Sequence, residues 1–198
     1  QADLEYIGNG QTQAGEHTIT ISVPESTNYL GASTTAKLTI NKAQSVITVE
    51  GVTVTYDGNV HSIEASLNHS EKPLVYDNND KTNAGTYQVT ISVDESTNYL
   101  GTSTTATLKI NQAQSVITVS DKTVTYDGHA HSITATLNHD QADLEYIGNG
   151  QTQAGEHTIT ISVPESTNYL GASTTAKLTI NKAQATIDAE NLTVTYNK

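Results

Sequence analysis

Apolar and polar residues alternate along most of the chain, in short runs that turn residues separate. In the stretch SIEASL the apolar residues Ile63, Ala65 and Leu67 alternate with polar ones, and 86–93 and 106–110 show the same spacing. Because side chains on a strand point alternately to its two faces, this pattern predicts half-buried β-strands. No segment has the apolar spacing of a long helix, so we expect an all-β fold.

Turn signals divide this pattern into short strands. Asp57 and Gly58 favour a tight hairpin turn, because glycine accepts a positive φ. The segment DESTNYLG at 94–101 lacks the alternation, and we expect it to form a turn or a single helical turn that Gly101 ends. The expected strands of one unit lie near 45–49, 52–56, 61–67, 73–77, 86–93 and 103–110.

The pattern repeats every 70 residues, and residues 1–42 are identical to residues 141–182. Such a period indicates tandem modules, each a small supersecondary unit. The expected modules are a partial repeat at 1–42, complete repeats at 43–112 and 113–182, and a partial repeat at 183–198. These boundaries are the first phase of the repeat. A second phase, with later boundaries, divides the chain into 1–57, 58–127 and 128–198. It cuts the hairpin turn but leaves fewer modules incomplete.

The two complete repeats differ at 26 of 70 positions, and the differences show which face is buried. Glu64 and Ser66 both become threonine in the second copy, whereas the apolar residues that flank them are kept. Among nine inner positions on three strands only Val89 changes, to isoleucine. A packed core tolerates a change of one methylene, so the alternating apolar residues are expected to form the core.

Composition limits both the core and the partners. The chain has no Cys, Met, Trp or Phe, so Val, Ile, Leu, Ala and Tyr must build the core. The net charge is −12 and the nine lysines are scattered. Because phosphate binding needs clustered basic residues, we expect no nucleic-acid partner. No apolar run approaches membrane-spanning length, so no membrane insertion is expected of these residues.

Three patterns suggest a metal or phosphate site, and each has a simpler interpretation. His129, His131 and His139 could form a zinc site, but the first repeat has asparagine at the first position, and His131 is expected to hydrogen-bond near the hairpin. DNND at 77–80 lacks the spaced acidic residues of a calcium loop. GNGQTQAG at 148–155 has neither the helix nor the lysine that follow a phosphate loop. We therefore expect turns and no metal site.

Exposed positions vary between the copies, with one exception. ESTNYLG is kept in all three copies, at 25–31, 95–101 and 165–171. No nucleophile motif, paired carboxylates or cofactor fingerprint is present, so we expect neither an enzyme nor a cofactor. The recurring tyrosines are expected to anchor the core and its rim. If the repeats bind a ligand, the candidate residues are Glu95, Asn98, Tyr99, Glu165, Asn168 and Tyr169.

The order of motifs TVTYDGxxHSI, NAGTYQVTISV, STNYLG and TATLKINQA resembles the YDG-type and MBG-type tandem repeats of large bacterial surface proteins. The resemblance covers the whole chain. It implies a linear array of small Ig-like or β-grasp-like modules of 70 residues each. It also implies a non-catalytic stalk of a cell-surface adhesin, which projects a separate adhesive domain away from the cell wall.

The resemblance places the protein outside the bacterial cell, attached to the wall through parts beyond these 198 residues. The expected partners are neighbouring repeats of the same chain, and a host surface through another domain. Two alternatives stay open: multivalent repeats that recognise a host glycan or protein, and homotypic association between cells. Because exposed strands recruit neighbours, the final TVTYNK is expected to pair with 1–42 of another molecule under the first phase, or within 128–198 under the second.

Overall fold

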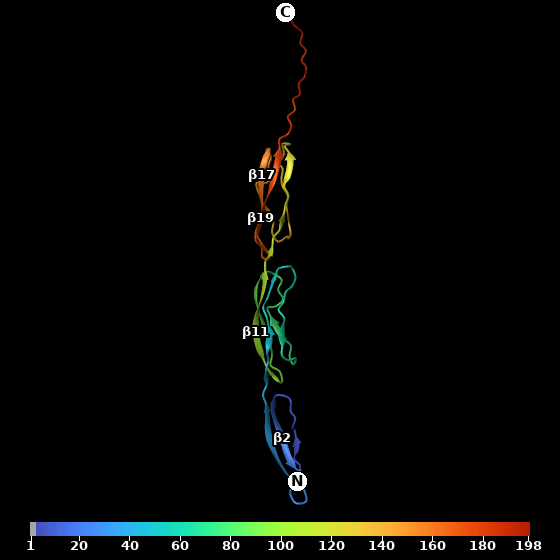
Figure 1. The fold of residues 1–198 in the computed structure, drawn as a ribbon, viewed down its shortest axis with the longest axis vertical. Coiled ribbons are helices and arrows are strands. Elements are labelled where there is room, and N and C mark those ends of the chain that lie inside the picture. Colours follow the sequence, from blue (N-terminus) through green and yellow to red (C-terminus); the bar gives the residue numbers. More distant parts are fainter. Residues whose placement is uncertain (1–2) are drawn as a thin grey trace. The chain divides into compact units, whose positions relative to one another are not determined.

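The computed structural model describes residues 3–198 and consists of two compact units, Gln1–Asn111 and Gln112–Lys198 (Figure 1). All the regular structure among these residues is β-strand, which confirms the predicted all-β class. Residues 3–198 contain no helix long and apolar enough to cross a membrane. Each unit contains one four-stranded sheet, accompanied by a three-stranded sheet in the first unit and by an extended tail in the second.

The strands follow the expected pattern closely in both units. Those of the first unit are β1 (Glu5–Ile7), β2 (Gly15–Val23), β3 (Ala32–Ile40), β4 (Ala43–Gln44), β5 (Ile47–Val49), β6 (Val52–Thr55), β7 (Ala65–Leu67), β8 (Val75–Asp77), β9 (Gly85–Val93), β10 (Tyr99–Leu100) and β11 (Thr102–Asn111). Those of the second unit are β12 (Ala113–Gln114), β13 (Ile117–Thr118), β14 (Lys122–Thr125), β15 (Thr136–Leu137), β16 (Glu145–Ile147), β17 (Gly155–Val163), β18 (Tyr169–Leu170) and β19 (Ala172–Asn181).

A four-stranded sheet forms the centre of each complete repeat, with the order β6-β11-β9-β8 in the first unit and β14-β19-β17-β16 in the second. The two longest strands of each sheet form an antiparallel pair. The strand near the start of the repeat then adds to the last strand in parallel, so that Val52 lies opposite Leu108. This pairing connects the beginning of 43–112 with its end, while the module boundaries themselves stay a prediction.

Two small sheets complete each repeat. β5 pairs with β7 and β13 with β15 in antiparallel fashion, and β4 pairs with β10 and β12 with β18 in parallel. The strand expected at 61–67 was predicted too long, because it begins only at Ala65. The side chain of Asn79 replaces a strand partner at Ile63, since its amide contacts the backbone N–H and C=O of that residue at 2.8 and 3.0 Å.

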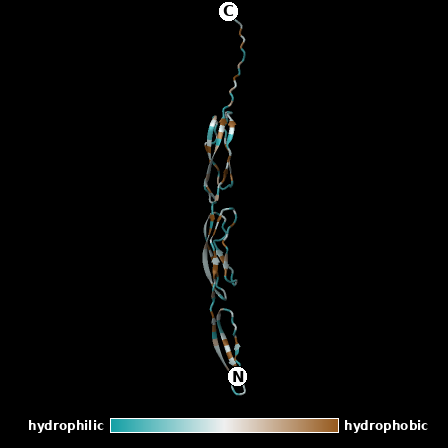
Figure 2. Ribbon diagram, in the orientation of Figure 1, coloured by the Kyte–Doolittle hydropathy of each residue, from teal (hydrophilic) through white to brown (hydrophobic). Residues whose placement is uncertain are grey.

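The core of each repeat lies between these sheets and contains the residues that the alternation predicts. Ile91 and Leu108 are completely buried in the first unit, while Glu64 and Ser66 are exposed. Figure 2 shows hydrophobic residues on the central strands of each repeat. The buried cluster comprises Ile63, Val89, Ile91, Leu108 and Ile110 in the first unit, and Ile133, Ile159, Ile161, Ala176, Leu178 and Ile180 in the second.

The segment 183–198 forms an extended tail without regular structure, and all its residues are exposed (Figure 1, red). Residues 193–196 pair with no strand within residues 3–198. The pairing that the second phase predicts inside 128–198 is therefore not found. The tail carries hydrophobic residues along its length (Figure 2).

Candidate functional site: the ESTNYLG loop

The ESTNYLG loop, at 25–31, 95–101 and 165–171, forms the same tight turn in all three places. In the middle copy the backbone N–H of Ser96 donates to the carbonyl of Tyr99 at 2.9 Å, and the other two copies repeat this bond at the same length. Of the two predicted alternatives, a turn or a single helical turn, the turn is observed. The sequence of the loop therefore determines its conformation in each place.

Glycine at the end of the loop is required by a close approach of the backbone. A Cβ atom at Gly101 would lie 2.9 Å from the backbone nitrogen of Glu95 and 3.1 Å from the carbonyl oxygen of Val93. Real Cβ atoms do not approach backbone atoms this closely, so the chain folds back on itself here only with glycine. Gly101 ends no helix, and it lies between β10 and β11.

The start of each complete repeat lies against its own ESTNYLG loop. The backbone N–H of Ala43 donates to the carbonyl of Asn98 at 2.8 Å, and β4 continues this contact by pairing with Tyr99 and Leu100. In the second unit Ala113 makes the same 2.8 Å bond to Asn168. The loop is thus part of the sheet that opens each repeat.

A histidine covers the tyrosine of the loop. The rings of His69 and Tyr99 stack with their centroids 3.8 Å apart. Ser45 orients this histidine, because its hydroxyl lies 2.9 Å from the Nε2 atom of His69 and also donates to the carbonyl of Leu100. Tyr99 is therefore an anchor within its repeat. The second unit repeats the arrangement with Ser115, His139, Tyr169 and Leu170.

The polar residues of the middle loop hold the preceding partial repeat. The ammonium group of Lys42 contacts the carboxylate of Glu95 and donates to the carbonyl of Ser96 at 2.7 Å. The side-chain oxygen of Asn98 accepts a 2.8 Å hydrogen bond from the backbone N–H of Ala14. The loop thus contacts both the segment that follows β3 and the hairpin that precedes β2.

The second unit shows that this contact needs a donor but no positive charge. Gln112 occupies the position of Lys42 one period later. Its side-chain amide donates to the carboxylate of Glu165 and to the carbonyl of Ser166, both at 2.8 Å. The substitution of lysine by glutamine preserves the two acceptors and replaces the ion pair by a neutral donor.

Glu71 is hydrogen-bonded to the middle loop. Its carboxylate accepts hydrogen bonds from the hydroxyl of Ser96 at 2.7 Å and from the side-chain and backbone nitrogens of Asn98 at 2.7 and 3.1 Å. These bonds, those from Asn98 first, lower the pKa of Glu71 below its usual value. The second unit has Gln141 there, whose side-chain oxygen lies 3.5 Å from the hydroxyl of Ser166.

The three histidines considered for a zinc site do not come together: His129 and His131 both lie beside Asp127, whereas His139 stacks on Tyr169 of the loop. His61 and His131 contact Asp57 and Asp127 at 2.9 and 3.0 Å, which confirms the predicted hydrogen bonds. The hairpin expected at Asp57 and Gly58 was wrong, because the strands on either side pair with β11 and β5 and not with each other. The side chain of His129 is 84% exposed. Within residues 3–198 no group of three or more His, Cys, Asp or Glu side chains is arranged to hold a metal ion. Residues 78–80 and 148–154 connect neighbouring strands, as predicted, while Asp77 ends β8 and Gly155 begins β17.

Sequence reasoning missed several residues of this site. Ser45 and His69 were detectable, because both complete repeats retain them at the same positions. Lys42 and Glu71 gave no such signal, since the other repeat has glutamine in both places. Ala14 contributes only its backbone N–H, which no side-chain pattern marks.

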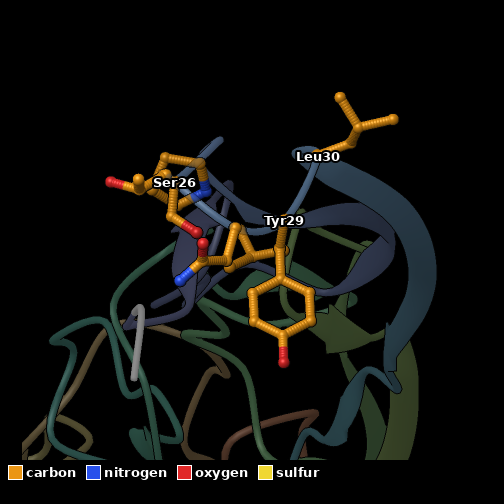
Figure 3. Close-up of a pocket in the computed structure, with 7 residues that line it drawn as sticks. Ser26, Tyr29 and Leu30 are labelled. Carbon is orange, nitrogen blue, oxygen red and sulfur yellow. The ribbon is translucent and has the colours of Figure 1, made fainter.

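The first copy of the loop is open to solvent. Tyr29 is 80% exposed and Leu30 is 84% exposed, and with Ser26 they line a shallow hollow (Figure 3). Figure 3 shows the side chains of Tyr29 and Leu30 projecting in opposite directions, as on a strand. The other two copies of the loop differ, because β4 and β12 pair with them at this place. The full lining consists of Val23, Pro24, Ser26, Thr27, Asn28, Tyr29 and Leu30.

Two consecutive ranges of the chain, 45–114 and 115–184, match the family model described as the MBG domain. The chain belongs to the MBG domain family. This assignment confirms the resemblance to MBG-type tandem repeats, and the two MBG matches cover more than half of the 198 residues. Among curated proteins, none matches this MBG chain.

Several solved structures are weakly similar to the MBG chain. The immunoglobulin domains 1–5 of Sidekick-1 match 86% of this chain and 46% of their own at 11% identity, with a TM-score of 0.37. The titin domains z1z2, solved in complex with telethonin, match 73% of this chain and 100% of their own at 13% identity, with a TM-score of 0.41. Domains EC1-4 of Drosophila N-cadherin match 87% of this chain and 59% of their own at 11% identity, with a TM-score of 0.33. The chain thus spans less than half of the Sidekick-1 structure, and likeness at this level adds no argument about function.

Proposed function

We propose that these MBG repeats are a non-catalytic stalk of a bacterial surface adhesin, which holds a separate adhesive domain away from the cell wall. The observation that supports this function is the use of the ESTNYLG loop as a joint between repeats. Glu95, Ser96 and Asn98 direct their polar groups at residues of the preceding segment 1–42. These contacts give a structural reason for the retention of ESTNYLG in all three copies.

A joint explains which positions vary and which do not. A ligand site would require the same exposed side chains in each copy, yet exposed residues such as Glu64 and Ser66 change. The loop is kept because each repeat must present the same acceptors to the segment before it. The donor on that segment is free to change from Lys42 to Gln112, since both side chains reach the same two oxygens.

The joint holds the partial repeat at two separated points. Lys42 lies on the connection itself, whereas Ala14 belongs to the hairpin before β2, 28 positions earlier. The connection between Ile40 and Ala43 contains neither glycine nor proline, unlike a flexible linker. Two points of attachment resist bending in a way that a single connection does not, which suits a spacer.

The proposal places the protein outside the cell, attached to the wall through parts beyond these residues. Its partners are the neighbouring MBG repeats and, through another domain, a host surface. It needs no cofactor, and its scattered lysines suit no nucleic acid.

Residual dipolar couplings measured by NMR on the whole chain test the joint. If the joint is rigid, residues 5–42 and 43–112 share one alignment tensor in the native protein. Asn98→Ala combined with Lys42→Ala should give the two segments different tensors, because both attachments are lost. Thr97→Ala is the matched control, since Thr97 is exposed in the same loop and should leave one tensor. Two different tensors in the native protein would overturn the stalk proposal.

The retention of ESTNYLG in all three copies is also compatible with a second candidate, a set of repeats that bind a host glycan or protein. Screening the whole chain against glycan and host-protein arrays separates the two functions. Binding that Tyr29→Ala abolishes and Thr27→Ala preserves would establish the second candidate.

A further inference from the structure

Both complete repeats carry the same groove, which lies between the turn that ends β5 and residues 62–66 in the first unit, and between the turn that ends β13 and residues 132–136 in the second. Its volume is about 680 Å³ in the first unit and about 400 Å³ in the second. The residues that line the two grooves correspond at the 70-residue period, so that Ser62 takes the place of Ser132. The groove is therefore a feature of the repeat, and its two copies can be compared.

The groove exists because β5 leaves its partner strand early. β5 pairs with β7 from Ile47 to Val49, and the chain then turns away at Glu50 and Gly51 to enter β6. β6 lies at the edge of the four-stranded sheet, where it pairs with β11. Within residues 3–198, no strand therefore lies beside 62–64 on the edge that β5 occupies further along.

The backbone of 62–64 offers hydrogen-bonding groups to the groove. The N–H and C=O of Ile63 both bind the side-chain amide of Asn79, at 2.8 and 3.0 Å. Because the backbone groups of an extended segment point alternately to its two edges, those of Ser62 and Glu64 point to the opposite edge, toward the groove. One wall of the groove is thus the open edge of a strand.

The second repeat fills its groove with a lysine of its own. The ammonium group of Lys122, in β14, donates to the carbonyl of Ser132 at 2.8 Å. Both residues line the groove, so this bond crosses it and shows that the wall accepts an ammonium group. The first repeat has Val52 at the position of Lys122. Of the described residues that line its groove, none is basic.

Charge separates the two grooves further. Glu50 and Glu64 line the first groove, where the second has Ser120 and Thr134. The turn of the second repeat also carries Asp121, but the carboxylate of this residue accepts a backbone N–H of β19 at 2.7 Å. The walls of the first groove therefore carry two negative charges and no positive one, which complements a cationic ligand.

We propose that the groove of the first complete repeat binds an extended, lysine-containing segment of a partner protein. The segment lies as an added strand beside residues 62–64, where its backbone pairs with the open edge. Its lysine takes the role that Lys122 has in the second repeat, so the ammonium group donates to the carbonyl of Ser62. The carboxylates of Glu50 and Glu64 on the same walls strengthen the binding of this positive charge.

A peptide uses more of this groove than a small free amine does. Val49, Val52 and Ala65 give the groove an apolar wall, and the strand edge gives it backbone partners, both of which a free amine would leave unused. The site belongs to one repeat alone. The variation at Glu64, which argues against a ligand site common to all repeats, is what distinguishes the two grooves. The inference is independent of the stalk role and of the ESTNYLG loop.

Amide chemical shifts measured by NMR on the whole chain test the site, with a blocked pentapeptide that carries one lysine between valines as the probe. The amides of 62–66 should shift as the peptide is added, and those of 132–136 should not. The same peptide with norleucine in place of lysine is the control, and it should bind at least about tenfold more weakly because it has no ammonium group. No shift at 62–66, equal shifts in both grooves, or equal binding of the two peptides would overturn the proposal.

Substitutions that exchange the two grooves test the role of charge. Glu50→Ser with Glu64→Thr gives the first groove the side chains of the second, and it should weaken binding of the lysine peptide by at least about tenfold. Asp77→Asn with Asp94→Asn is the matched control, because it removes the same charge from exposed positions of the same repeat that do not line the groove. All four residues are exposed, so neither pair of changes weakens the fold. Unchanged binding in the first variant, or an equal loss in both, would contradict the proposal.

Other occupants of the groove give different results in the same titration. Spermidine that displaces the peptide at an equal concentration would identify a free polyamine as the ligand. Shifts of the amides of 62–66 that appear when only the protein concentration is raised would identify a second copy of this chain. Either result would overturn the assignment of the groove to a partner's lysine-containing strand.

Discussion

The identical segments 1–42 and 141–182 allow one substitution to be compared in two environments. Leu178→Ala removes a side chain that is completely buried among Ile159, Ile161 and Ile180. The loss combines the transfer of the missing carbons with an unfilled cavity, and it should cost about 2–5 kcal/mol.

The same substitution at Leu38 should cost much less. This side chain is already 36% exposed, and its removal leaves a surface that water fills, so no closed cavity remains. Only part of the transfer free energy is lost, about 1 kcal/mol. Because the neighbouring sequence is the same in both places, the difference between the two costs measures the burial that the covering strands β12 and β14 provide in the second unit.

Native-state amide exchange followed by NMR is the suitable measurement, because it reports each segment separately. The amide of Ile161 reports on the second unit and that of Ile21 on the partial repeat. Equal losses of protection at the two amides would refute the argument that covering strands account for the difference in burial.

Three further predictions concern the first unit. Ile91→Ala should lower the free energy of unfolding by about 2–5 kcal/mol in urea denaturation, because the side chain is completely buried. Glu64→Thr, a change already present in the other repeat, should be near neutral. Equal losses of stability in the two variants would contradict the assigned faces. Glu71 has a lowered pKa, so its stabilisation is present above the unfolded value of 4.5 and is lost as the pH falls through the lower folded value. Thermal melts across this window should show a smaller pH dependence for Glu71→Gln, and an unchanged dependence would refute this. Gly101→Ala should cost about 1–3 kcal/mol through the close backbone contact, and an unshifted melting temperature would exclude the strain.

The sequence was sufficient to predict the longer strands and the faces that they bury, but not the two-residue strands β10 and β18. Alternation is a local property, and the comparison of repeats showed that Glu64 varies while Ile63 does not. The sequence did not predict which segments meet. Lys42 and Glu95 are 53 positions apart, and Asn79 takes the place of a strand partner at Ile63 through its side-chain amide. Contacts of this kind depend on tertiary placement, which alternation does not encode.

The sequence located the candidate site, because ESTNYLG is retained in every copy, but it did not predict what the site contacts. ESTNYLG is shared by all three copies, and in the complete repeats it is partly covered, since Ser96 and Asn168 are buried. The structure places its polar groups against Lys42 in the first unit and Gln112 in the second. A motif that holds a neighbouring repeat and a motif that holds a ligand are retained in the same way. The contact of Asn98 with the backbone of Ala14 distinguishes them, and only coordinates reveal it.

The parallel pairing of β6 with β11 determines how a complete repeat carries mechanical load. β6 lies near the start of the repeat and β11 at its end, so tension applied through the chain pulls the two strands lengthwise past each other. Four residue pairs join them, and the N–H of Tyr56 adds a 2.8 Å bond to the carbonyl of Asn111. In this geometry the bonds are stretched together in shear, whereas a hairpin pulled from its open end loses them one at a time. We expect single-molecule pulling to rupture a complete repeat in one high-force step, and gradual unzipping at low force would show that the load takes another route.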